Sequence, residues 1–348
     1  MVFRISKSLE RQIELLMKKR LHTVFKHTCC TVVLSFLFSV NSFSQSLLFQ
    51  TGRVIWEAGI NVGPSFFLGD LGGNAGKGTR FIKDVNLQFT NIMKGGYIAA
   101  YPTDWLGFRL AIQSGTLEAD DAAVNTKGVD ELWRKQRNLD FRTNISEVYI
   151  AAEVFPLMLF NAIAENNPRM RPYGVIGIGM FHFNPQGSLS DANGNKTWYY
   201  LHPLRTEGEG MTEYPNRKPY SLTQYNIPMG FGIKYFLSDR FNVSSEFLYR
   251  KSFTDYIDDV STEYIDPALF DKYLSAPDAA IARKIHDKVY GIVTPGITRY
   301  APGTQRGNPK QDDAYFSFLM KFGVRLGSIY ENDIQRKASH QSRCPAKF

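Results

Sequence analysis

The feature that most constrains this chain is a strict two-residue alternation of apolar and polar positions in several long segments. In WLGFRLAIQ (105–113) and in AYFSFLMKFGVRL (314–326), a large apolar side chain occurs at nearly every second residue. That period belongs to an extended strand whose two faces meet unlike environments. The segments are also long enough to cross a bilayer when the strand is tilted. The alternation therefore predicts β-strands, with either water or lipid on the outer face.

Eight segments have the composition or alternation of strands, and no other segment of the predicted mature chain approaches a membrane-spanning helix. They are 54–68, 87–102, 104–117, 143–156, 170–184, 223–237, 240–252 and 314–327.

The connections between these segments alternate between short and long. Four are long (69–86, 118–142, 185–222 and 253–313), one is moderate (157–169) and two are tight turns (102–103 and 238–239). Outer-membrane barrels have short periplasmic turns, long external loops and an even strand number. A soluble β-sandwich also alternates, but it has no reason to gather its long loops at one end. We predict an all-β protein, a transmembrane antiparallel eight-stranded outer-membrane β-barrel with long external loops. The helical composition of 267–291 predicts that the last loop is partly helical.

The less apolar face of the predicted strands carries acids and bases in equal number. An eight-stranded barrel has an interior that side chains fill, and buried charges must be paired. We therefore predict a salt-bridged plug in the lumen rather than a channel. Its residues are Glu57, Arg109, Glu147, Glu153, Lys234, Glu246, Lys321 and Arg325. Aromatic residues near strand ends predict interface girdles, and these are Trp56, Tyr101, Trp105, Tyr173, Tyr235, Phe236 and Phe241.

The N-terminus has the pattern of an export signal. A basic region precedes the apolar run 31–40, and Ser42 and Ser44 occupy the positions that a signal peptidase inspects. Met17 is an alternative start. An uncleaved membrane anchor is the other interpretation, although the run is shorter than the ~20 residues of a spanning helix. We predict a signal peptide (1–44), a barrel (45–327) and a periplasmic tail (328–348).

The net charge of +8 does not indicate a nucleic-acid partner. Residues 1–44 carry seven basic and two acidic side chains, so most of the excess lies in the predicted signal peptide. The other charges alternate in sign and do not form a basic patch. We therefore expect no nucleic acid among the partners.

The densest group of carboxylates is FTDYIDDVSTEYID (253–266). Carboxylates at this density can bind a divalent cation, and Asp255, Asp258 and Asp259 are weak candidates for ligands. The alternative is a motif that fixes a loop, because Asp and Ser bond nearby backbone amides and Asp266 before Pro267 suits a helix start. We favour the loop-fixing interpretation and predict no metal site and no cofactor.

His182 is the best placed histidine for acid–base chemistry. No nucleophile with a positioned base can be recognised around it. We therefore predict no catalytic residue and no small-molecule substrate.

Several stretches together resemble the PorG-type outer-membrane barrels of the type IX secretion system. The resemblance covers 54–327 in order, and its motifs are WEAGINVGPSFFLGDLGG (56–73), FIKDVN (81–86), WLGFRLAIQSGTLEADD (105–121), RNLDFRTNISEVYIAAEVF (137–155), DYIDDVSTEYID (255–266) and RGNPKQDDAYFSFLMKFGVRL (306–326).

This resemblance implies a non-catalytic barrel in the outer membrane of a Gram-negative bacterium, surrounded by outer-membrane lipid. It implies association with the periplasmic ring of the secretion apparatus, formed by a lipoprotein and its partner, and support of cargo export. The segment 327–348 departs from the usual pattern, in which the last strand ends the chain, and is either a disordered tail or a docking segment for the ring. Two other functions stay open. One is a surface binding or adhesin barrel that acts through its loops, and the other is a small lipid-modifying enzyme that uses His182 or the carboxylates of 255–266.

Overall fold

The computed structural model of the chain describes residues 54–72, 89–123, 134–160, 168–289 and 301–326. The predicted signal peptide (1–44) and periplasmic tail (328–348) lie outside these residues. The long strands are β1 (Ile55–Leu68), β2 (Asn91–Tyr101), β3 (Leu106–Asp120), β4 (Asp140–Val154), β5 (Met170–His182), β8 (Thr223–Phe236), β9 (Phe241–Ser252) and β10 (Ala314–Leu326).

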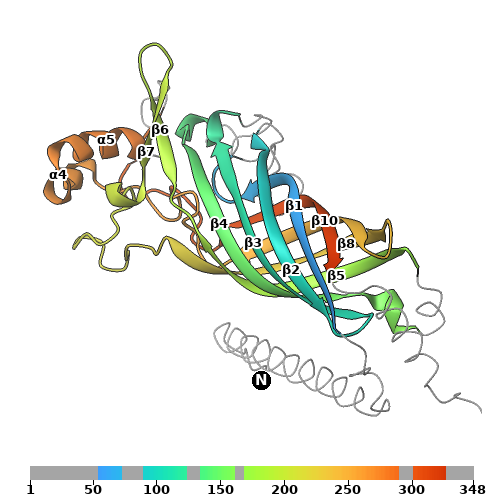
Figure 1. Cartoon of the computed structure of the whole chain (residues 1–348). Coiled ribbons are helices and arrows are strands. Elements are labelled where there is room, and N and C mark those ends of the chain that lie inside the picture. The colour runs from blue at the N-terminus through green and yellow to red at the C-terminus, as the bar shows by residue number, and fades with distance from the viewer. Residues whose placement is uncertain (1–53, 73–88, 124–133, 161–167, 290–300, 327–348) are drawn as a thin grey trace, which may run out of the picture. The chain divides into compact units, whose positions relative to one another are not determined.

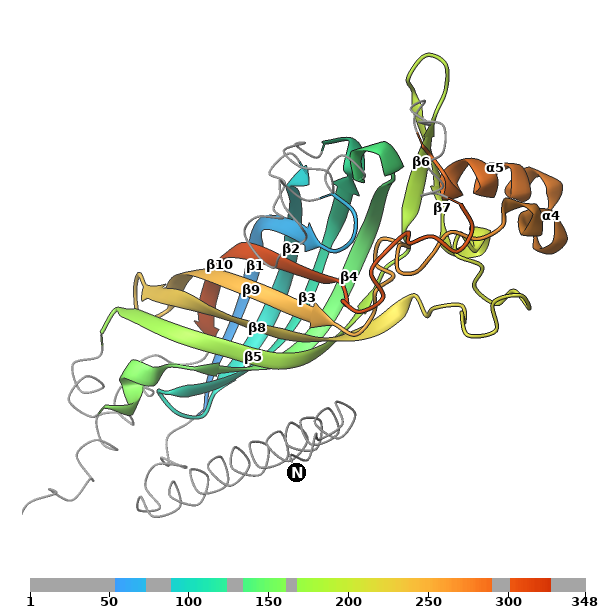
Figure 2. The ribbon, with the colours of Figure 1, turned by 180° about the vertical axis from the view of Figure 1, so that it is seen from behind.

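These eight long strands form one closed antiparallel barrel (Figures 1 and 2). Neighbours in sequence pair with each other, β5 pairs with β8, and the pairing of β10 with β1 completes the ring. In that seam Glu57 lies opposite Arg325 and Phe66 opposite Phe316. Closure satisfies the backbone hydrogen bonds within the sheet, which is the condition for β-structure in lipid. The predicted fold class is confirmed.

The outward face of the barrel is a belt of large apolar side chains. On β3, Phe108, Leu110 and Ile112 are 50%, 48% and 64% exposed, whereas Arg109 between them is 1% exposed. The same alternation continues around the barrel to Phe318, Met320 and Phe322 on β10, all of them outward-facing and exposed. A continuous apolar surface of this extent is stable against lipid and not against water.

The strand ends differ from the predicted ones mainly on the side of the long loops. β3 continues to Asp120 and β4 begins at Asp140, and these two residues face each other in register. The first three residues of β4 are Asp140, Phe141 and Arg142, which the sequence pattern assigned to the loop. The β3–β4 hairpin therefore extends farther than the predicted limits of 117 and 143.

The long connection 185–222 begins with a β-hairpin, which the sequence pattern did not predict. It consists of β6 (Gln186–Ser190) and β7 (Lys196–Tyr200), and it continues the sheet next to β4 through the pair Arg142 and Gln186 (Figure 1). Oδ1 of Asp191 accepts hydrogen bonds from the backbone amides of Asn193 (2.9 Å) and Asn195 (2.8 Å), which closes the turn. Two strands of five residues each are too short to show a period among so many turn residues.

The last external loop is partly helical, as predicted. It contains the 3-10 turn η6 (Pro267–Leu269) and the helices α4 (Phe270–Tyr273) and α5 (Ala276–His286). The Asp266 side chain accepts from the amide of Ala268 at 2.9 Å and starts the first turn. Ser275 caps α5 by accepting from the amide of Asp278. The other 3-10 turns are η3 (Asp121–Ala123), η4 (Pro156–Leu159) and η5 (His202–Leu204). Within the described parts of the chain, no helix is long and apolar enough to cross a membrane.

Aromatic residues at the short-turn end are divided between the two faces of the barrel. Three are exposed and fit the predicted girdle: Trp56, Tyr235 and Phe241. Three others belong to an inward aromatic cluster around the buried Phe155: Tyr101, Trp105 and Tyr173. For these three the girdle prediction is wrong, because proximity to a strand end does not determine which face a side chain occupies.

Candidate functional site

The centre of the lumen holds four charged side chains in direct contact. Arg109 on β3 lies 2.8 Å from Glu246 on β9 and 3.0 Å from Glu153 on β4. Lys321 on β10 contacts the same two carboxylates, each at 3.2 Å. Tyr173 on β5 also donates to Glu246 at 2.7 Å. Every charge of this group therefore faces an opposite charge in a volume from which water is largely excluded.

A second part of the lumen network surrounds Glu57 on β1. Its carboxylate accepts from Lys234 at 3.0 Å, from Tyr97 at 2.9 Å and from Asn242 at 2.8 Å. Lys234 is also 3.7 Å from Glu153, which joins this group to the first one. The tyrosines and asparagine satisfy carboxylate oxygens that a single ion pair leaves open.

A third part contains a base that the sequence prediction missed. Arg250 on β9 is fully buried and lies 3.3 Å from Glu147 on β4. Its guanidinium also donates to Ser317 at 2.5 Å and to Gln113. The signal was present in the sequence, because Arg250 is four residues from Glu246 and therefore shares its face of the strand.

Arg325 is placed differently from the other seven predicted residues. Its guanidinium lies over the ring of Phe236 at 4.2 Å, and the side chain is partly exposed near the short-turn end. Seven of the eight predicted residues thus meet in the lumen, with Arg250 in place of Arg325. We call this set the lumen network: Glu57, Arg109, Glu147, Glu153, Lys234, Glu246, Arg250 and Lys321.

The lumen network is electrically neutral and fills the barrel with charged, amide and phenol groups. An apolar outer belt around a closed, polar interior is the design of a bacterial outer-membrane barrel. The protein is an outer-membrane β-barrel. The described side chains inside this barrel contact one another across the lumen, as expected for an eight-stranded barrel whose interior is filled by side chains.

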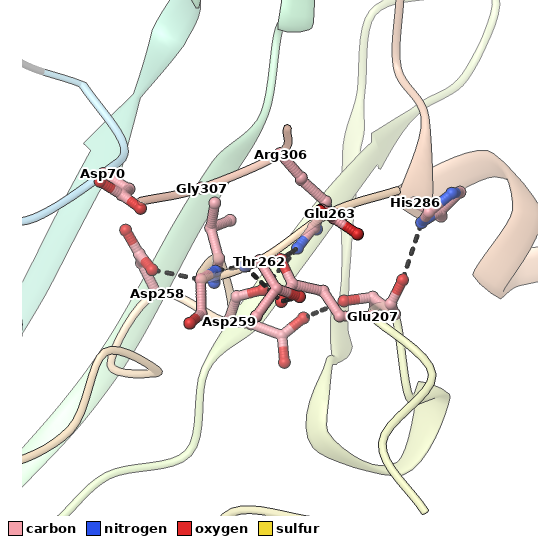
Figure 3. Close-up of polar contacts among 12 residues, drawn as sticks. Asp70, Glu207, Asp258, Asp259, Thr262, Glu263, His286, Arg306 and Gly307 are labelled. Atoms are coloured by element: carbon pink, nitrogen blue, oxygen red, sulfur yellow. Dashed lines mark hydrogen bonds and ion pairs between the residues drawn. The ribbon is translucent and has the colours of Figure 1, made fainter. Parts of the chain in front are cut away.

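The long loops of the barrel are joined by a second buried network, centred on the acidic stretch 253–266. We call the described parts of 69–72, 121–139, 183–222 and 253–313 the external cap. Asp258 accepts from the amides of Leu71 (3.1 Å) and Val260 (3.0 Å). Asp259, which has a left-handed φ of 64°, accepts from the hydroxyls of Thr206 (2.5 Å) and Tyr220 (2.6 Å). Two adjacent aspartates, both labelled in Figure 3, therefore bind two different loops.

Glu207 is the second centre of the cap. Its carboxylate accepts from the amides of Ser261 (3.0 Å) and Thr262 (2.8 Å), and Arg306 forms an ion pair with it at 2.9 Å. The same Arg306 nitrogen donates to the carbonyl of Asp259 at 2.6 Å. Figure 3 shows Glu207 and Arg306 meeting beside Thr262. The pair Glu207–Arg306 thus ties the β5–β8 loop to both halves of the last loop.

A third contact holds the first two loops. Asp121 pairs with Arg137 at 2.7 Å and accepts from the amide of Gly72 at 3.1 Å. Arg137 also donates to the carbonyls of Arg306 (2.6 Å) and Asp70 (2.7 Å). All four long loops are consequently connected through buried side chains.

The histidines of the described chain are used structurally. His286 at the end of α5 is buried, and its Nδ1 donates to the carbonyl of Thr206 at 2.7 Å. Burial, together with the charge of Arg306, lowers the pKa of His286 to about 3, so its ring is neutral. His182 is exposed on β5 and contacts the Thr223 hydroxyl at 3.1 Å. It makes no described contact with the carboxylates of 255–266, which are the other residues that the enzyme hypothesis named.

The three candidate metal ligands, Asp255, Asp258 and Asp259, lie in different surroundings. Asp258 and Asp259 use their oxygens to accept hydrogen bonds within the cap. Asp255 is 8% exposed, and neither of its oxygens has a hydrogen-bond donor in good geometry. In the part of the chain that the structure describes, no three histidine, cysteine or carboxylate side chains are grouped closely enough to hold a metal ion.

No protein-family model matches the chain, and a search of curated proteins also finds no match. Among solved structures, the chain is similar to the attachment invasion locus protein Ail of Yersinia pestis, with a TM-score of 0.29, 8% identity, and 79% of this chain and 99% of that one covered. It is also similar to a major outer membrane protein of Thermus thermophilus (0.35, 10%, 78% and 99%) and to OprG of Pseudomonas aeruginosa (0.27, 10%, 80% and 100%). Similarity at this level adds nothing about function, and the fold assignment depends on the barrel's own geometry.

Proposed function

We propose that this barrel is a non-catalytic, non-conducting component of the type IX secretion system, which associates with the periplasmic ring and supports the export of cargo. The lumen network is the observation that supports a non-catalytic, non-conducting barrel. A barrel filled by mutually paired charges acts through its surfaces and not through a pore.

The assignment to type IX secretion is supported by the motifs that the chain shares with PorG-type barrels. Two of them, 255–266 and 306–326, supply the carboxylates and the arginine at the centre of the external cap as well as Lys321 in the lumen. The resemblance therefore includes residues with specific buried partners and is not confined to general strand composition. On this proposal the ring binds the opposite end of the barrel, through the turns 102–105, 155–169 and 237–240 or through the tail 328–348.

A deletion strain of the native bacterium tests the secretion role. We expect cargo with C-terminal sorting domains to accumulate inside the cell, while the envelope stays intact by a dye-exclusion assay. Complementation with the wild-type gene restores export. Normal export in the deletion strain would contradict the proposal.

Co-purification with the ring tests the contact surface. The full-length barrel and a chain that ends at Gly327 are each solubilised in mild detergent and captured through a tag placed after the predicted signal peptide. If the tail is the docking segment, only the full-length chain retains the ring lipoprotein and its partner. If both chains retain them, the turns make the contact. If the full-length chain retains neither the ring lipoprotein nor its partner, the proposed association is wrong.

The lipid-modifying enzyme is the weaker alternative. Asp258 is buried and accepts hydrogen bonds from backbone amides, and the described contact of His182 is with the Thr223 hydroxyl. A binding barrel would act through the external cap. It predicts normal secretion in the deletion strain together with loss of a surface-binding phenotype, so the same strain separates it from the proposed function.

A further inference from the structure

The external cap buries many more carboxylates than bases. Two arginines, Arg137 and Arg306, lie among them. The carboxylates that are buried or nearly so are Asp70, Asp121, Glu207, Glu209, Asp255, Asp258, Asp259 and Asp313. Carboxylates without counter-charges cannot all stay ionised in a region from which water is excluded.

Both arginines are already committed to other partners. Arg137 is bound to Asp121 and to two backbone carbonyls, and Arg306 is bound to Glu207. The remaining acids therefore have no lysine or arginine paired with them by a described ion pair. The imbalance is greatest where Asp255, Asp258 and Asp313 meet.

These three residues, which we call the carboxyl cluster, are brought together by short backbone links. Oδ2 of Asp313 accepts from the amide of Ile257 at 2.8 Å, next to Asp258. Oδ1 of Asp313 is buried without a hydrogen-bond partner, and so are both oxygens of Asp255. The absence of a side chain at Gly69 makes room for Asp313, because a Cβ there would lie 2.2 Å from its Oδ1. Buried carboxylate oxygens that accept nothing are costly as anions and favourable as neutral acids.

We propose that Asp255, Asp258 and Asp313 hold protons at neutral pH, and that the external cap consequently loosens as the medium becomes alkaline. Protonation removes the charge of a buried carboxyl group, and with it both the cost of desolvating an anion and the repulsion between neighbouring acids. The inference concerns the cap alone and does not depend on the proposed secretion role.

The direction of the pH dependence follows from the surroundings of each acid. Burial, with the charge of Asp70, raises the pKa of Asp255 to about 9, although the nearby Ser261 side chain lowers it. Burial raises the pKa of Asp258 and of Asp313 well above the usual range, and Asp70 adds to both shifts. The folded cap thus binds protons that the opened cap releases. The contribution of these acids to stability is complete below the ordinary aspartate pKa of about 4 and is lost progressively as the pH rises from there toward 9.

Other titratable groups in the external cap also affect how its stability depends on pH. Burial raises the pKa of Glu209 to about 8 and of Asp70 to about 6, so these acids add to the same trend. Burial also raises the pKa of Asp259 to about 6. His286 acts in the opposite sense. Burial lowers its pKa, so the ring takes up a proton more readily when the cap is open, and acid therefore destabilises the cap through this residue. Tyr256 and Tyr264 stay neutral, since burial raises the pKa of each. A pH range from about 6.5 to 9.5 therefore isolates the acids.

Infrared spectroscopy of the full chain in lipid vesicles tests the proton directly. Protonated carboxylic acids have a carbonyl stretch that carboxylates lack. At pH 7, the difference between the wild type and Asp313→Asn, and between the wild type and Asp255→Asn, should contain this band. The matched control is Asp312→Asn, which changes the exposed neighbour of Asp313 and should leave the band unchanged. The absence of the band in both difference spectra would overturn the proposal.

Native-state proteolysis tests the consequence for the cap. Cleavage within 253–289 of the wild type and of the Asp312→Asn control, corrected for the protease's own pH profile with an unstructured peptide substrate, should rise about tenfold per pH unit for each proton released. Asp255→Asn and Asp313→Asn should flatten this rise. An equal slope in all variants would contradict the proposal. So would protection by calcium at pH 9 together with stoichiometric calcium binding in equilibrium dialysis, because a cation would then replace the protons.

Discussion

Lys321 shows how one side chain can determine whether a lumen stays closed. It lies 3.2 Å from both Glu153 and Glu246 and is fully buried on the inner face of β10. Its desolvation as a cation is unfavourable, but its removal leaves Arg109 as the one described base that contacts both carboxylates. In a closed barrel, water cannot easily replace the missing charge.

We predict that Lys321→Met lowers the free energy of unfolding by about 3–5 kcal/mol, the usual effect of leaving a buried charge unpaired. Lys251→Met removes an exposed charge from the outer face of β9 and should change this free energy by at most about 0.5 kcal/mol. Urea unfolding in lipid vesicles, followed by tryptophan fluorescence, measures both. Equal effects of the two substitutions would contradict the place of Lys321 in the lumen network.

Glu207 has the corresponding role in the external cap. Glu207→Gln keeps the shape of the side chain but removes the charge that pairs with buried Arg306. We predict that this variant opens the cap and increases protease cleavage within 253–289, at a cost of about 3–5 kcal/mol to the cap. Glu263→Gln is the control, because its ion pair with Arg217 is half exposed and is worth at most about 1 kcal/mol. Equal resistance of the two variants to protease cleavage within 253–289 would be evidence against Glu207 as a centre of the cap.

At the scale of residues, sequence identified the lumen charges through their two-residue period. It missed Arg250, although Arg250 shares the period of Glu246, and it included Arg325, which has the right period but lies near the end of the strand. A two-residue period shows which face of a strand a residue occupies, but it does not show how deep in the barrel the residue lies. The depth of a residue depends on the register between strands, such as Trp56 opposite Leu326, which only the folded barrel displays.

At the scale of elements, the long strands were predictable and the cap was only partly so. Strands that separate lipid from a polar lumen must alternate over their whole length, so β3 and β10 are plain in the sequence. The β6–β7 hairpin faces no such constraint and is hidden among turn residues. The helical composition of 267–291 did reveal α5, because Ser275 and Pro277 mark its start.

The helices of the cap have a small core of their own around the fully buried Phe270. We predict that Phe270→Ala weakens the packing of α4 and α5 by about 3–5 kcal/mol and leaves the barrel intact. Hydrogen exchange should show faster exchange in 270–286 with unchanged protection of β9 and β10. Lys284→Ala on α5 is the control and should change neither. Loss of protection in the strands would mean that cap and barrel do not unfold separately.

At the scale of the whole molecule, the barrel joins a neutral interior to a cap that connects all of its long loops. Interior and cap use the same chemistry, buried carboxylates with hydrogen bonds from several directions. They differ in balance, because the lumen network has one base for each acid and the cap has an excess of acids. The lumen is therefore expected to be insensitive to pH over the range in which the cap responds.

We predict that the reconstituted protein conducts no steady ionic current across a planar bilayer. A variant in which 257–307 is replaced by a short Gly-Ser linker should also be silent, because the lumen network and not the cap closes the barrel. Insertion is verified by heat-modified migration of the folded barrel on a gel. Steady conductance in the wild type would refute a closed lumen, and conductance in the shortened variant alone would move the barrier to the cap.

The cap joins the two strands that complete the ring. Asp258 receives the amide of Leu71 directly after β1, and Asp313 directly before β10 receives the amide of Ile257. The second contact lies within the loop between β9 and β10, whereas the first joins that loop to the end of β1 and so depends on the seam that brings β1 beside β10. A barrel whose first and last strands have not yet paired therefore lacks the contact of Asp258 with Leu71. We expect the acidic stretch of such a chain to be cleaved by proteases more readily than that of the closed barrel.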